Sequence, residues 1–444
     1  MYSAGSAHAR VAPKAFARRR HRHGSAVLMF ALIAAVAAAR PAGSDRPIGN
    51  AVTHWNAVAT DAFTPSQGTN PMAQSRTLAI MHAAMHDALN AIDRRFEAYT
   101  PGLHAAPGAS VEAAVASAAR DVLVVLLPDQ AALVEAAYGR ALAAVPDGPA
   151  KIAGTAAGHA AASANMTRRQ GDRFETATEP LYAPRLGPGE YQFTRPFNFA
   201  ALPGLGRVTP FVVDIREHAV DGPQRLSSVE YARDLAYVKA LGDTNSSIRT
   251  PEQSEIAQFW YEDSPLGWNR IANTVVRQRG LDPWSAARAF ALVNFAMADG
   301  FITGFEAKYR FRFWRPETAI HEAATDGNRL TEADPTWRPF MVTPPVPDYP
   351  STHTVLGWAA AEVLIELFGD KVAYRADSLT LPGVIRHFKG FSAAAEENGL
   401  SRLYAGIHFP HAVRDGRRQG RSIGRAVGEA LAPVRWTSST STSR

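Results

Sequence analysis

The chain has 444 residues, of which 46% are hydrophobic and 20% charged, a composition that suits a globular protein with a large core and excludes global disorder. It contains no cysteine, which excludes disulfides, thiol catalysis and cysteine-ligated metal sites. The formal net charge of +6 comes from six basic residues within positions 1–39, so positions 40–444 have no net charge and give no support for nucleic-acid binding.

Positions 1–39 have the pattern of a secretory signal peptide. A basic segment, Arg18–His23, precedes the apolar run Ala26–Ala39, which ends in small residues suited to cleavage. The run is shorter than the roughly 20 residues that a membrane-spanning helix needs, although an N-terminal anchor helix is the alternative. We therefore expect an exported protein, periplasmic or extracellular, with no membrane association beyond export.

Apolar residues at helical spacing predict helices through most of the remaining chain. The predicted helices are 75–92 with Ser75 as N-cap, 111–127, 130–144, 150–168, 228–240, 251–259, 267–278, 284–313, 354–368 and one from Pro410 onward. The best strand candidate is the short segment 211–215. The sequence thus predicts an all-α, multi-helix fold.

Two segments rich in proline interrupt this pattern. Residues 168–207 predict a long irregular connection with a functional or covering role, and residues 334–350 predict a rigid loop. We divide the chain after the signal peptide into an N-terminal helical region (40–205) and a C-terminal helical region (206–436). The Ser/Thr-rich tail, 437–444, is expected to be disordered.

The first segment with candidate site residues is 308–316. Lys308 and Arg315 are seven residues apart, so they share one face if a single helix runs through both. Two cations among aromatic residues either pair with carboxylates or bind an anion. Asp299, upstream on the same predicted helix, is a candidate for orienting a histidine or neutralising a lysine.

The second segment is Pro350-Ser351-Thr352-His353, at the start of the predicted helix 354–368. Unpaired backbone N–H groups and the helix dipole favour an anion there. Ser351 can add a hydroxyl donor, and His353 is then held beside the anion. Taken alone, the segment could equally be a plain helix cap with His353 on the surface.

The third segment, 401–408, contains Arg402 and His408, which are six residues apart with Gly406 between them. A helix that ends near Gly406 would turn His408 toward the group that Arg402 contacts. The next helix has a glycine at every fourth position from Gly416 to Gly428. Glycine destabilises helices, so we expect this stripe to be a smooth face that packs closely against another helix.

Together the three segments supply one lysine, two arginines, a serine and two histidines, a set that suits a tetrahedral oxyanion with an imidazole beside it. Their order and spacing resemble the signature of the vanadium-dependent haloperoxidase and type 2 phosphatidic acid phosphatase superfamily. The resemblance runs from Trp260 through Gly424 and includes the earlier phrases WNAVATDAF and AIMHAAMHDALNAI. It looks like the soluble bacterial haloperoxidase-like branch, which implies an all-α fold of helical bundles of the haloperoxidase and acid phosphatase type.

The resemblance also implies a vanadate cofactor and a role for each residue around its oxygens. Lys308, Arg315 and Arg402 would neutralise the equatorial oxygens. Ser351 and the backbone N–H of Thr352 would donate hydrogen bonds to the same oxygens. These five residues would form the cofactor-binding set together with a histidine ligand.

The two histidines would then carry the chemistry. His408 would be the one protein ligand of the vanadium, and His353 the acid–base group near the apical oxygen. Lys308 would polarise the bound hydrogen peroxide, which a halide attacks to give hypohalous acid. The expected partners are therefore hydrogen peroxide, a halide and an organic acceptor, with an oligomer possible and no nucleic acid.

Two residues depart from the family pattern. Thr352 stands where the family usually has glycine; only its backbone N–H is needed, so we expect tolerance with some loss of space above the anion. Ala412 stands where the wider superfamily often has an aspartate that orients the final histidine. The orientation of His408 is therefore open, and a backbone carbonyl is one substitute.

Two other functions fit the same residues. In a soluble phosphatase, phosphate would be the substrate with no cofactor; His408 would form a phosphohistidine and His353 would protonate the leaving group. A non-catalytic oxyanion-binding protein is the third reading.

Other candidate residues lie outside the three segments. His82 and His86 are four residues apart and followed by Asp87; they could hold a divalent metal, but we expect a packed helix face. His411 could tune acidity or lie on the surface. Halide preference cannot be read from the sequence, although Phe305 and Val346 would line the halide side.

Overall fold

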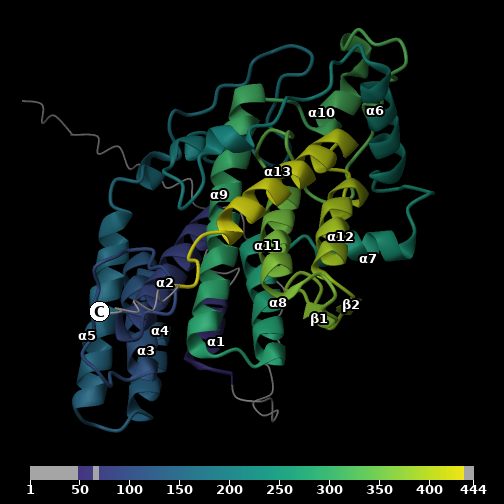
Figure 1. Ribbon diagram of the computed structural model, residues 1–444. Helices are drawn as coiled ribbons and strands as arrows, with labels where there is room; N and C mark the ends of the chain where they lie inside the picture. Colours follow the sequence, from purple (N-terminus) through teal and green to yellow (C-terminus); the bar gives the residue numbers. More distant parts are fainter. Residues whose placement is uncertain (1–48, 64–69, 435–444) are drawn as a thin grey trace, which may run out of the picture.

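The computed structural model describes residues 49–63 and 70–434 and is built almost entirely of helices (Figure 1). The predicted signal peptide (1–39) and tail (437–444) lie outside the described residues. The α-helices are α1 (Ala51–Ala62), α2 (Pro71–Ile92), α3 (Val111–Leu126), α4 (Ala131–Ala143), α5 (Pro149–Arg168), α6 (Val229–Leu241), α7 (Pro251–Phe259), α8 (Ser264–Arg279), α9 (Pro283–Phe311), α10 (Pro316–His321), α11 (Thr352–Phe368), α12 (Phe391–Tyr404) and α13 (Pro410–Gly428). The predicted all-α fold is confirmed, and none of these helices is both long and apolar enough to cross a membrane.

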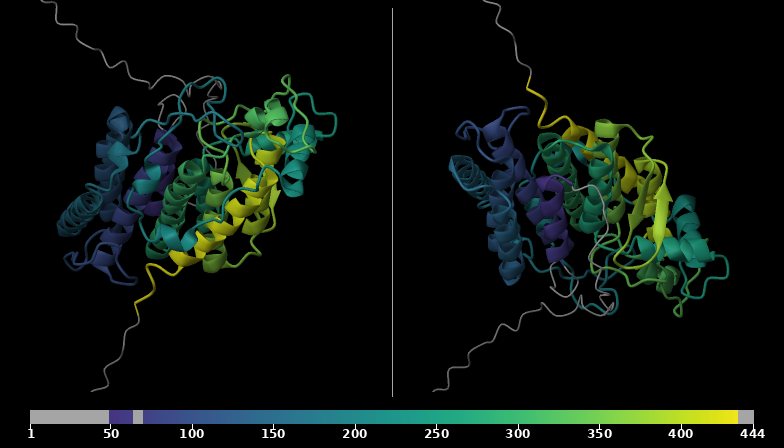
Figure 2. Two further views of the ribbon diagram at one scale, coloured as in Figure 1. Left: turned by 90° about the horizontal axis from the view of Figure 1, so that it is seen from above. Right: turned by 90° about the horizontal axis from the view of Figure 1, so that it is seen from below.

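The helices form a layered bundle around α9. Figure 1 shows α3, α4 and α5 at one side of the molecule, α9 through its middle, and α6, α7 and α10 at the opposite side. Both views in Figure 2 show the same order of layers. Helix α9 packs against α2 on one side and α11 on the other. One hydrophobic cluster extends from Val52 to Leu431, so helices from both sides of the predicted boundary at 205/206 share a core. The division into two regions stays a prediction.

Helix α2 starts earlier than the sequence predicted. The side chain of Asn70 accepts a hydrogen bond from the backbone N–H of Ala73, and Pro71 occupies the first turn. Ser75, predicted as the N-cap, lies inside the helix and is buried. The prediction was wrong because Asn followed by Pro is a stronger start signal than a lone serine one turn later.

Helix α9 ends sooner than predicted, which separates two site residues. Its last residue is Phe311, and Arg312 follows in the left-handed conformation with a φ of 48°. Arg315 is the N-cap residue of the next helix, α10. Lys308 and Arg315 therefore do not share a helix face, and only the turn between α9 and α10 brings them together.

The glycine stripe of α13 packs closely against α11, as predicted. A Cβ atom added at Gly416 would lie 2.7 Å from the carbonyl oxygen of Ser351, and one at Gly424 would lie 2.7 Å from that of Ala359. Any larger side chain would push the two helices apart. The stripe thus holds α13 directly against the start of α11, where the second motif lies.

The predicted strand at 211–215 does not form. The backbone N–H groups of Phe211, Val212 and Val213 instead donate to the carboxylate of Asp299, at 2.6, 2.8 and 3.0 Å. Asp299 therefore fixes a loop, and its predicted role toward a histidine or lysine is wrong. A two-stranded antiparallel sheet, β1 (Tyr374–Asp377) and β2 (Ile385–Phe388), was not predicted because both strands are only four residues long.

The segment 168–207 is irregular, as predicted, apart from two short 3-10 helices at Phe174–Thr176 and Leu205–Arg207. It is attached along the α9–α10 turn. The N–H of Tyr191 donates to the carbonyl of Arg312 at 2.7 Å, and the N–H of Trp314 donates to Gly189 at 2.9 Å. The segment therefore covers the turn that carries Arg315.

Candidate oxyanion site

The three sequence motifs meet in one buried place. Lys308 comes from α9, Arg315 from the start of α10, and His353 from the first turn of α11. Arg402 lies near the end of α12, and His408 lies in the turn between α12 and α13. Hydrogen bonds link these segments to one another, so the fold brings together every residue that the sequence proposed for the site.

Lys308 is directed at the main chain of the second motif. Its Nζ lies 2.6, 2.9 and 2.8 Å from the carbonyl oxygens of Pro347, Asp348 and Pro350. Burial and the guanidinium of Arg315 lower the pKa of Lys308 well below its ordinary value. Three carbonyl acceptors nevertheless require three N–H donors, which only the protonated amine has. All three donors of Lys308 are thus engaged by the backbone, and its effect on an anion would come through its charge and through the segment it holds.

Arg315 holds the third motif against the loop before the second. Its Nε donates to the carbonyl of Val346 at 2.8 Å, and its Nη1 donates to that of Ile407 at 2.6 Å. The same Nη1 lies 3.0 Å from Nε2 of His408. Because a guanidinium can only donate, Nε2 of His408 must carry a lone pair and Nδ1 the proton.

His408 is a neutral imidazole in this environment. Burial and the nearby cations, Arg315 first, lower its pKa well below the ordinary value. A neutral imidazole with an available lone pair is the form that binds a metal or attacks phosphorus, so Nε2 could do either only by giving up its hydrogen bond from Arg315 Nη1. The side chain of His408 is 4% exposed, so this lone pair faces the buried interior of the site.

Ser351 and Thr352 start helix α11 as predicted. Ser351 is the N-cap residue, and its side chain makes no capping bond to the helix. Its Oγ accepts a hydrogen bond from Oγ1 of Thr354 at 2.9 Å, so its own hydroxyl hydrogen is available to a further acceptor. The first backbone N–H groups of the helix, including that of Thr352, have no partner within the helix. The side chain of Thr352 is turned toward α9, where a Cβ on Gly304 would lie 3.4 Å from its Oγ1.

His353 and Arg402 share one backbone acceptor. Nε2 of His353 lies 3.0 Å from the carbonyls of both Trp260 and Glu262, and Nη1 of Arg402 donates to that of Trp260 at 3.3 Å. Nε2 of His353 therefore carries the proton, and Nδ1 is the nitrogen left to exchange one. Burial, with Arg402, lowers the pKa of His353 well below its ordinary value.

The sequence did not single out Asp348, which is a central residue of the site. It is fully buried; its Oδ1 lies 2.9 Å from Nδ1 of His408 and 3.9 Å from Nη1 of Arg315. The 2.9 Å contact is too poorly angled to count as an aligned hydrogen bond, although the distance is that of an ion pair. Burial raises the pKa of Asp348 to about 6, against the cation of Arg315, which lowers it. The available signal was an acidic residue in a proline-dense loop three positions before Ser351.

The donor set fits a tetrahedral oxyanion such as vanadate or phosphate. Three buried cations, Lys308, Arg315 and Arg402, outnumber the carboxylate of Asp348, whose pKa Arg315 and Lys308 lower, so these four residues together have a net positive charge. Nε of Arg402 is buried without a hydrogen-bond partner, and the hydroxyl hydrogen of Ser351 is free. Charged donors that lack a protein partner in a low-dielectric interior are suited to an anion.

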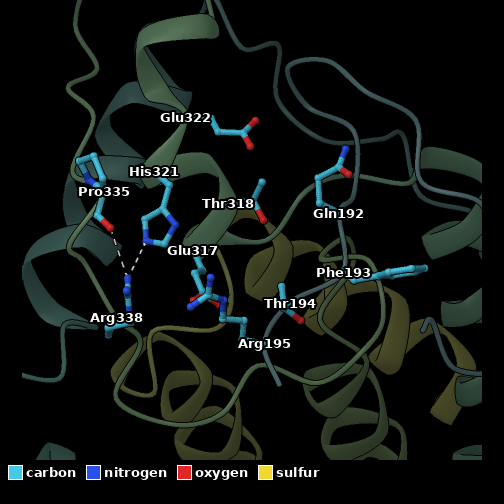
Figure 3. Close-up of a pocket in the computed structure, with 10 residues that line it drawn as sticks. All are labelled: Gln192, Phe193, Thr194, Arg195, Glu317, Thr318, His321, Glu322, Pro335 and Arg338. Carbon is cyan, nitrogen blue, oxygen red and sulfur yellow. Dashed lines mark hydrogen bonds between the residues drawn. The ribbon is translucent and has the colours of Figure 1, made fainter. Parts of the chain in front are cut away.

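A polar cavity of about 270 Å³ lies beside α10 (Figure 3). Its walls include Glu317 and His321 of α10 and Arg338, whose Nη1 lies 3.3 Å from Nε2 of His321. None of the predicted site residues lines this cavity. Its lining on α10 begins at Glu317, two residues after Arg315, and the rest comes from residues 192–195, Pro335 and Arg338.

His82, His86 and Asp87 have structural roles on α2. Nε2 of His82 lies 3.1 Å from Oδ1 of Asn56, and the His82 ring stacks on Phe290. His86 contacts the carbonyl of Glu97, and Asp87 accepts hydrogen bonds from two backbone N–H groups. Within residues 49–63 and 70–434, no cluster of three or more metal-ligating side chains occurs. The packed-face interpretation of this helix agrees with these contacts.

His411 is not a surface residue. It is buried, its Nδ1 lies 2.8 Å from a carboxylate oxygen of Asp234, and its ring stacks on Tyr349 and Phe409. The charge of His411 also helps to lower the pKa of Asp348. His411 therefore belongs to the supporting layer behind the site.

Comparisons with known proteins agree with this arrangement. Residues 288–434 match the family model described as the VCPO second helical-bundle domain. The chain is 25% identical over 287 residues to the vanadium chloroperoxidase of Curvularia inaequalis. That match covers 48% of this chain and 46% of the relative, so the chain spans less than half of that relative's length.

Solved structures extend the likeness to most of the chain. The structure of a bacterial vanadium-dependent iodoperoxidase superposes with a TM-score of 0.75 and 26% identity, over 86% of this chain and 96% of the other. An apo-type bacterial vanadium-dependent chloroperoxidase superposes with a TM-score of 0.66 at 16% identity, over 81% of this chain and 94% of the other, which shows a shared fold. The resemblance predicted from the three motifs is confirmed.

Proposed function

We propose that this chain, a relative of the vanadium-dependent haloperoxidases in sequence and fold, is a vanadate-dependent haloperoxidase that oxidises halide with hydrogen peroxide. One observation carries the proposal. A neutral His408, whose Nε2 lone pair accepts from Arg315 Nη1, lies among buried cations, and donors of Arg402 and Ser351 have no protein partner among the described residues. That combination suits a ligand which is both an oxyanion and a metal centre.

The residues that would hold vanadate follow from the geometry and from the resemblance. Arg402, Ser351 and the backbone N–H of Thr352 have donors to spare, and Arg315 and Lys308 supply further positive charge. His408 would be the protein ligand through Nε2. Bound vanadate would supply Lewis-acid activation of hydrogen peroxide.

Residues of this chain would accept the proton released in the reaction and would exclude water. The proton of His353 is held at Nε2 by two backbone carbonyls, so Nδ1 is the atom that would take a proton from hydrogen peroxide. Because burial keeps the pKa of His353 low, Nδ1 stays unprotonated and ready near neutral pH. Phe305 and Val346 are both buried, and an apolar wall of this kind would limit water beside the halide.

We also propose that the enzyme acts outside the cytoplasm. The support is the signal-peptide pattern of positions 1–39. Export would keep hypohalous acid away from the cell interior. Detection of the protein in the medium or periplasm, with its N-terminus after Ala39, would test this.

The first experiment is a halogenation assay. The purified chain is incubated with orthovanadate, then given hydrogen peroxide, a phenolic dye and iodide, bromide or chloride in separate reactions. We expect vanadate-dependent halogenation that His408→Ala abolishes. No halogenation with any halide at any vanadate concentration would contradict the proposal.

The phosphatase reading has support from the same neutral imidazole, which is also the nucleophilic form. It is tested on the same preparation without vanadate, using p-nitrophenyl phosphate. Phosphate release that vanadate inhibits, without halogenation, would establish it. Tight phosphate binding with neither activity would favour a binding protein.

A further inference from the structure

We infer that Asp348 is the positioning residue of the site: its carboxylate holds the His408 ring so that Nδ1–H faces Asp348 and Nε2 faces the oxyanion. This inference deepens the proposed function and rests on it for the identity of the anion. The position that often carries an orienting aspartate in the wider superfamily is Ala412 here, so another group must do this work.

The imidazole of His408 has a polar contact on each side. Nε2 of His408 lies 3.0 Å from Arg315 Nη1, which can only donate, so the proton must be on Nδ1. Nδ1 in turn lies 2.9 Å from Oδ1 of Asp348. The two neighbours therefore favour the same tautomer. Apart from the backbone N–H of Phe409, which helps to lower its pKa, the carboxylate of Asp348 has no other hydrogen-bond partner in the described residues.

Hydrogen bonds on both sides fix the backbone of Asp348. Its backbone N–H donates to the carbonyl of Phe313 at 2.9 Å, and its carbonyl accepts from Lys308 Nζ at 2.9 Å. Lys308 also holds the carbonyls of Pro347 and Pro350 on either side. The backbone of Asp348 is therefore held by hydrogen bonds to α9 and to the turn after it. A residue that orients a metal ligand needs such a fixed position.

The buried carboxylate of Asp415 and that of Asp234 have other partners. Asp415 accepts from the Tyr349 hydroxyl at 2.8 Å and from Arg414 Nε at 3.0 Å. Asp234 accepts a hydrogen bond from the backbone N–H of His411, and the same carboxylate lies beside Nδ1 of the His411 ring. Among the ion pairs of the described residues, the carboxylate paired with His408 is that of Asp348.

The expected effect follows from the behaviour of groups behind metal ligands. Removing such a partner costs roughly 10–100-fold in metal affinity, because the ligand ring loses its orientation and some basicity. Asp348→Ala should therefore weaken orthovanadate binding by roughly this factor. Asp348→Asn keeps the shape and one acceptor oxygen but loses the charge, so its loss should be smaller, at least about threefold.

The test uses the full chain and two readouts. The dissociation constant for orthovanadate is measured by calorimetry. The tautomer of His408 is read from long-range ¹H–¹⁵N correlation spectra of protein with ¹⁵N-labelled histidine, assigned by the signal lost in His408→Gln. Asp87→Asn is the matched control, because Asp87 is also a buried carboxylate whose pKa burial raises to about 6, but it lies on α2 among backbone amides.

The wild-type chain should show His408 protonated at Nδ1. In Asp348→Ala the ring is no longer held on its Nδ1 side and can turn away from Arg315, so the spectrum should show a mixture of the two tautomers. Asp87→Asn should leave both readouts unchanged. An Asp348→Ala protein with the wild-type tautomer and an affinity within twofold of wild type would overturn the inference. If Asp348→Ala does not fold, the test uses Asp348→Asn. An affinity of Asp348→Asn for orthovanadate equal to that of wild type would then overturn the inference.

Failure of the proposed function would look different. A wild-type chain that shows the Nδ1–H tautomer, mixed with the other tautomer in Asp348→Ala, but no halogenation would refute the haloperoxidase proposal and leave the positioning role standing.

Discussion

Nη1 of Arg315 lies 3.0 Å from Nε2 of His408 and 2.6 Å from the carbonyl oxygen of Ile407, the residue before it. One arginine therefore orients both the ring and the backbone of the third motif. Its Nε reaches Val346 at the same time, so the planar fork joins three chain segments that are far apart in sequence. Lysine has a single nitrogen and could not make these contacts together.

Arg315→Lys should consequently impair the site more than a conservative change of charge would suggest. We expect orthovanadate affinity to fall at least tenfold and the free energy of unfolding to fall by roughly 2–4 kcal/mol, because buried carbonyls lose their donors. Calorimetry and urea denaturation measure the two effects. Arg310→Lys is the control, since that side chain lies partly exposed on α9. Equal losses in both variants would contradict the special role of the fork.

Lys308→Met tests whether Lys308 stabilises the fold or only contacts the anion. The substitution leaves three buried carbonyls without their common donor, so we expect a loss of roughly 3–5 kcal/mol in unfolding free energy. His408→Ala, which empties the same site without releasing those carbonyls, should cost clearly less. Urea denaturation of both variants without vanadate makes the comparison. A Lys308→Met protein as stable as wild type would show that the 347–350 segment does not depend on this ammonium.

His82 predicts a pH dependence of stability. Burial lowers its pKa from 6.5 to about 3, so the unfolded chain takes up a proton below pH 6.5 and the folded chain does not. The contribution to stability is therefore complete above pH 6.5 and is lost as the pH falls toward 3, by about 2 kcal/mol at pH 5.

The measurement is urea denaturation of wild type and His82→Met at pH 7.5 and pH 5. The variant should lose less stability over this interval than wild type, even if it is less stable at both pH values. His387→Met, at an exposed position, should follow wild type. Parallel losses in wild type and His82→Met would mean that His82 is protonated in the folded state, as a partly solvated histidine would be.

Gly416→Ala should disturb the site from behind. The new Cβ would lie 2.7 Å from the carbonyl oxygen of Ser351, so α13 must move away from the start of α11. We expect a lower thermal midpoint and weaker orthovanadate binding. Gly139→Ala on α4 is the control, because a Cβ there meets no atom within 4 Å; its higher helix propensity should stabilise by up to about 1 kcal/mol. Unchanged vanadate affinity in Gly416→Ala would show that the contact does not set the position of Ser351.

The sequence determined the helical fold and the identity of the chemical groups. Periodicity located most helices to within a few residues, and α7 matched its predicted limits. The errors were the start of α2, the end of α9, the strand expected at 211–215, the two four-residue strands, and helix α1, which was not predicted. The two helix limits depend on a cap or a left-handed residue, which periodicity does not record, and the strands are too short to show an alternating pattern.

The motifs named Lys308, Arg315, Ser351, His353, Arg402 and His408, but only the tertiary structure decided how they are connected. Spacing suggested that Lys308 and Arg315 share a helix face, whereas Arg312 breaks that helix and the chain turns between them. The partner of His408 could not be found by spacing either. Asp348 precedes it by sixty positions, and the two meet because Lys308 clamps the loop of one while Arg315 holds the turn of the other. A sequence pattern records which groups are present along a helix, but contacts between distant loops are fixed by packing and by buried hydrogen bonds.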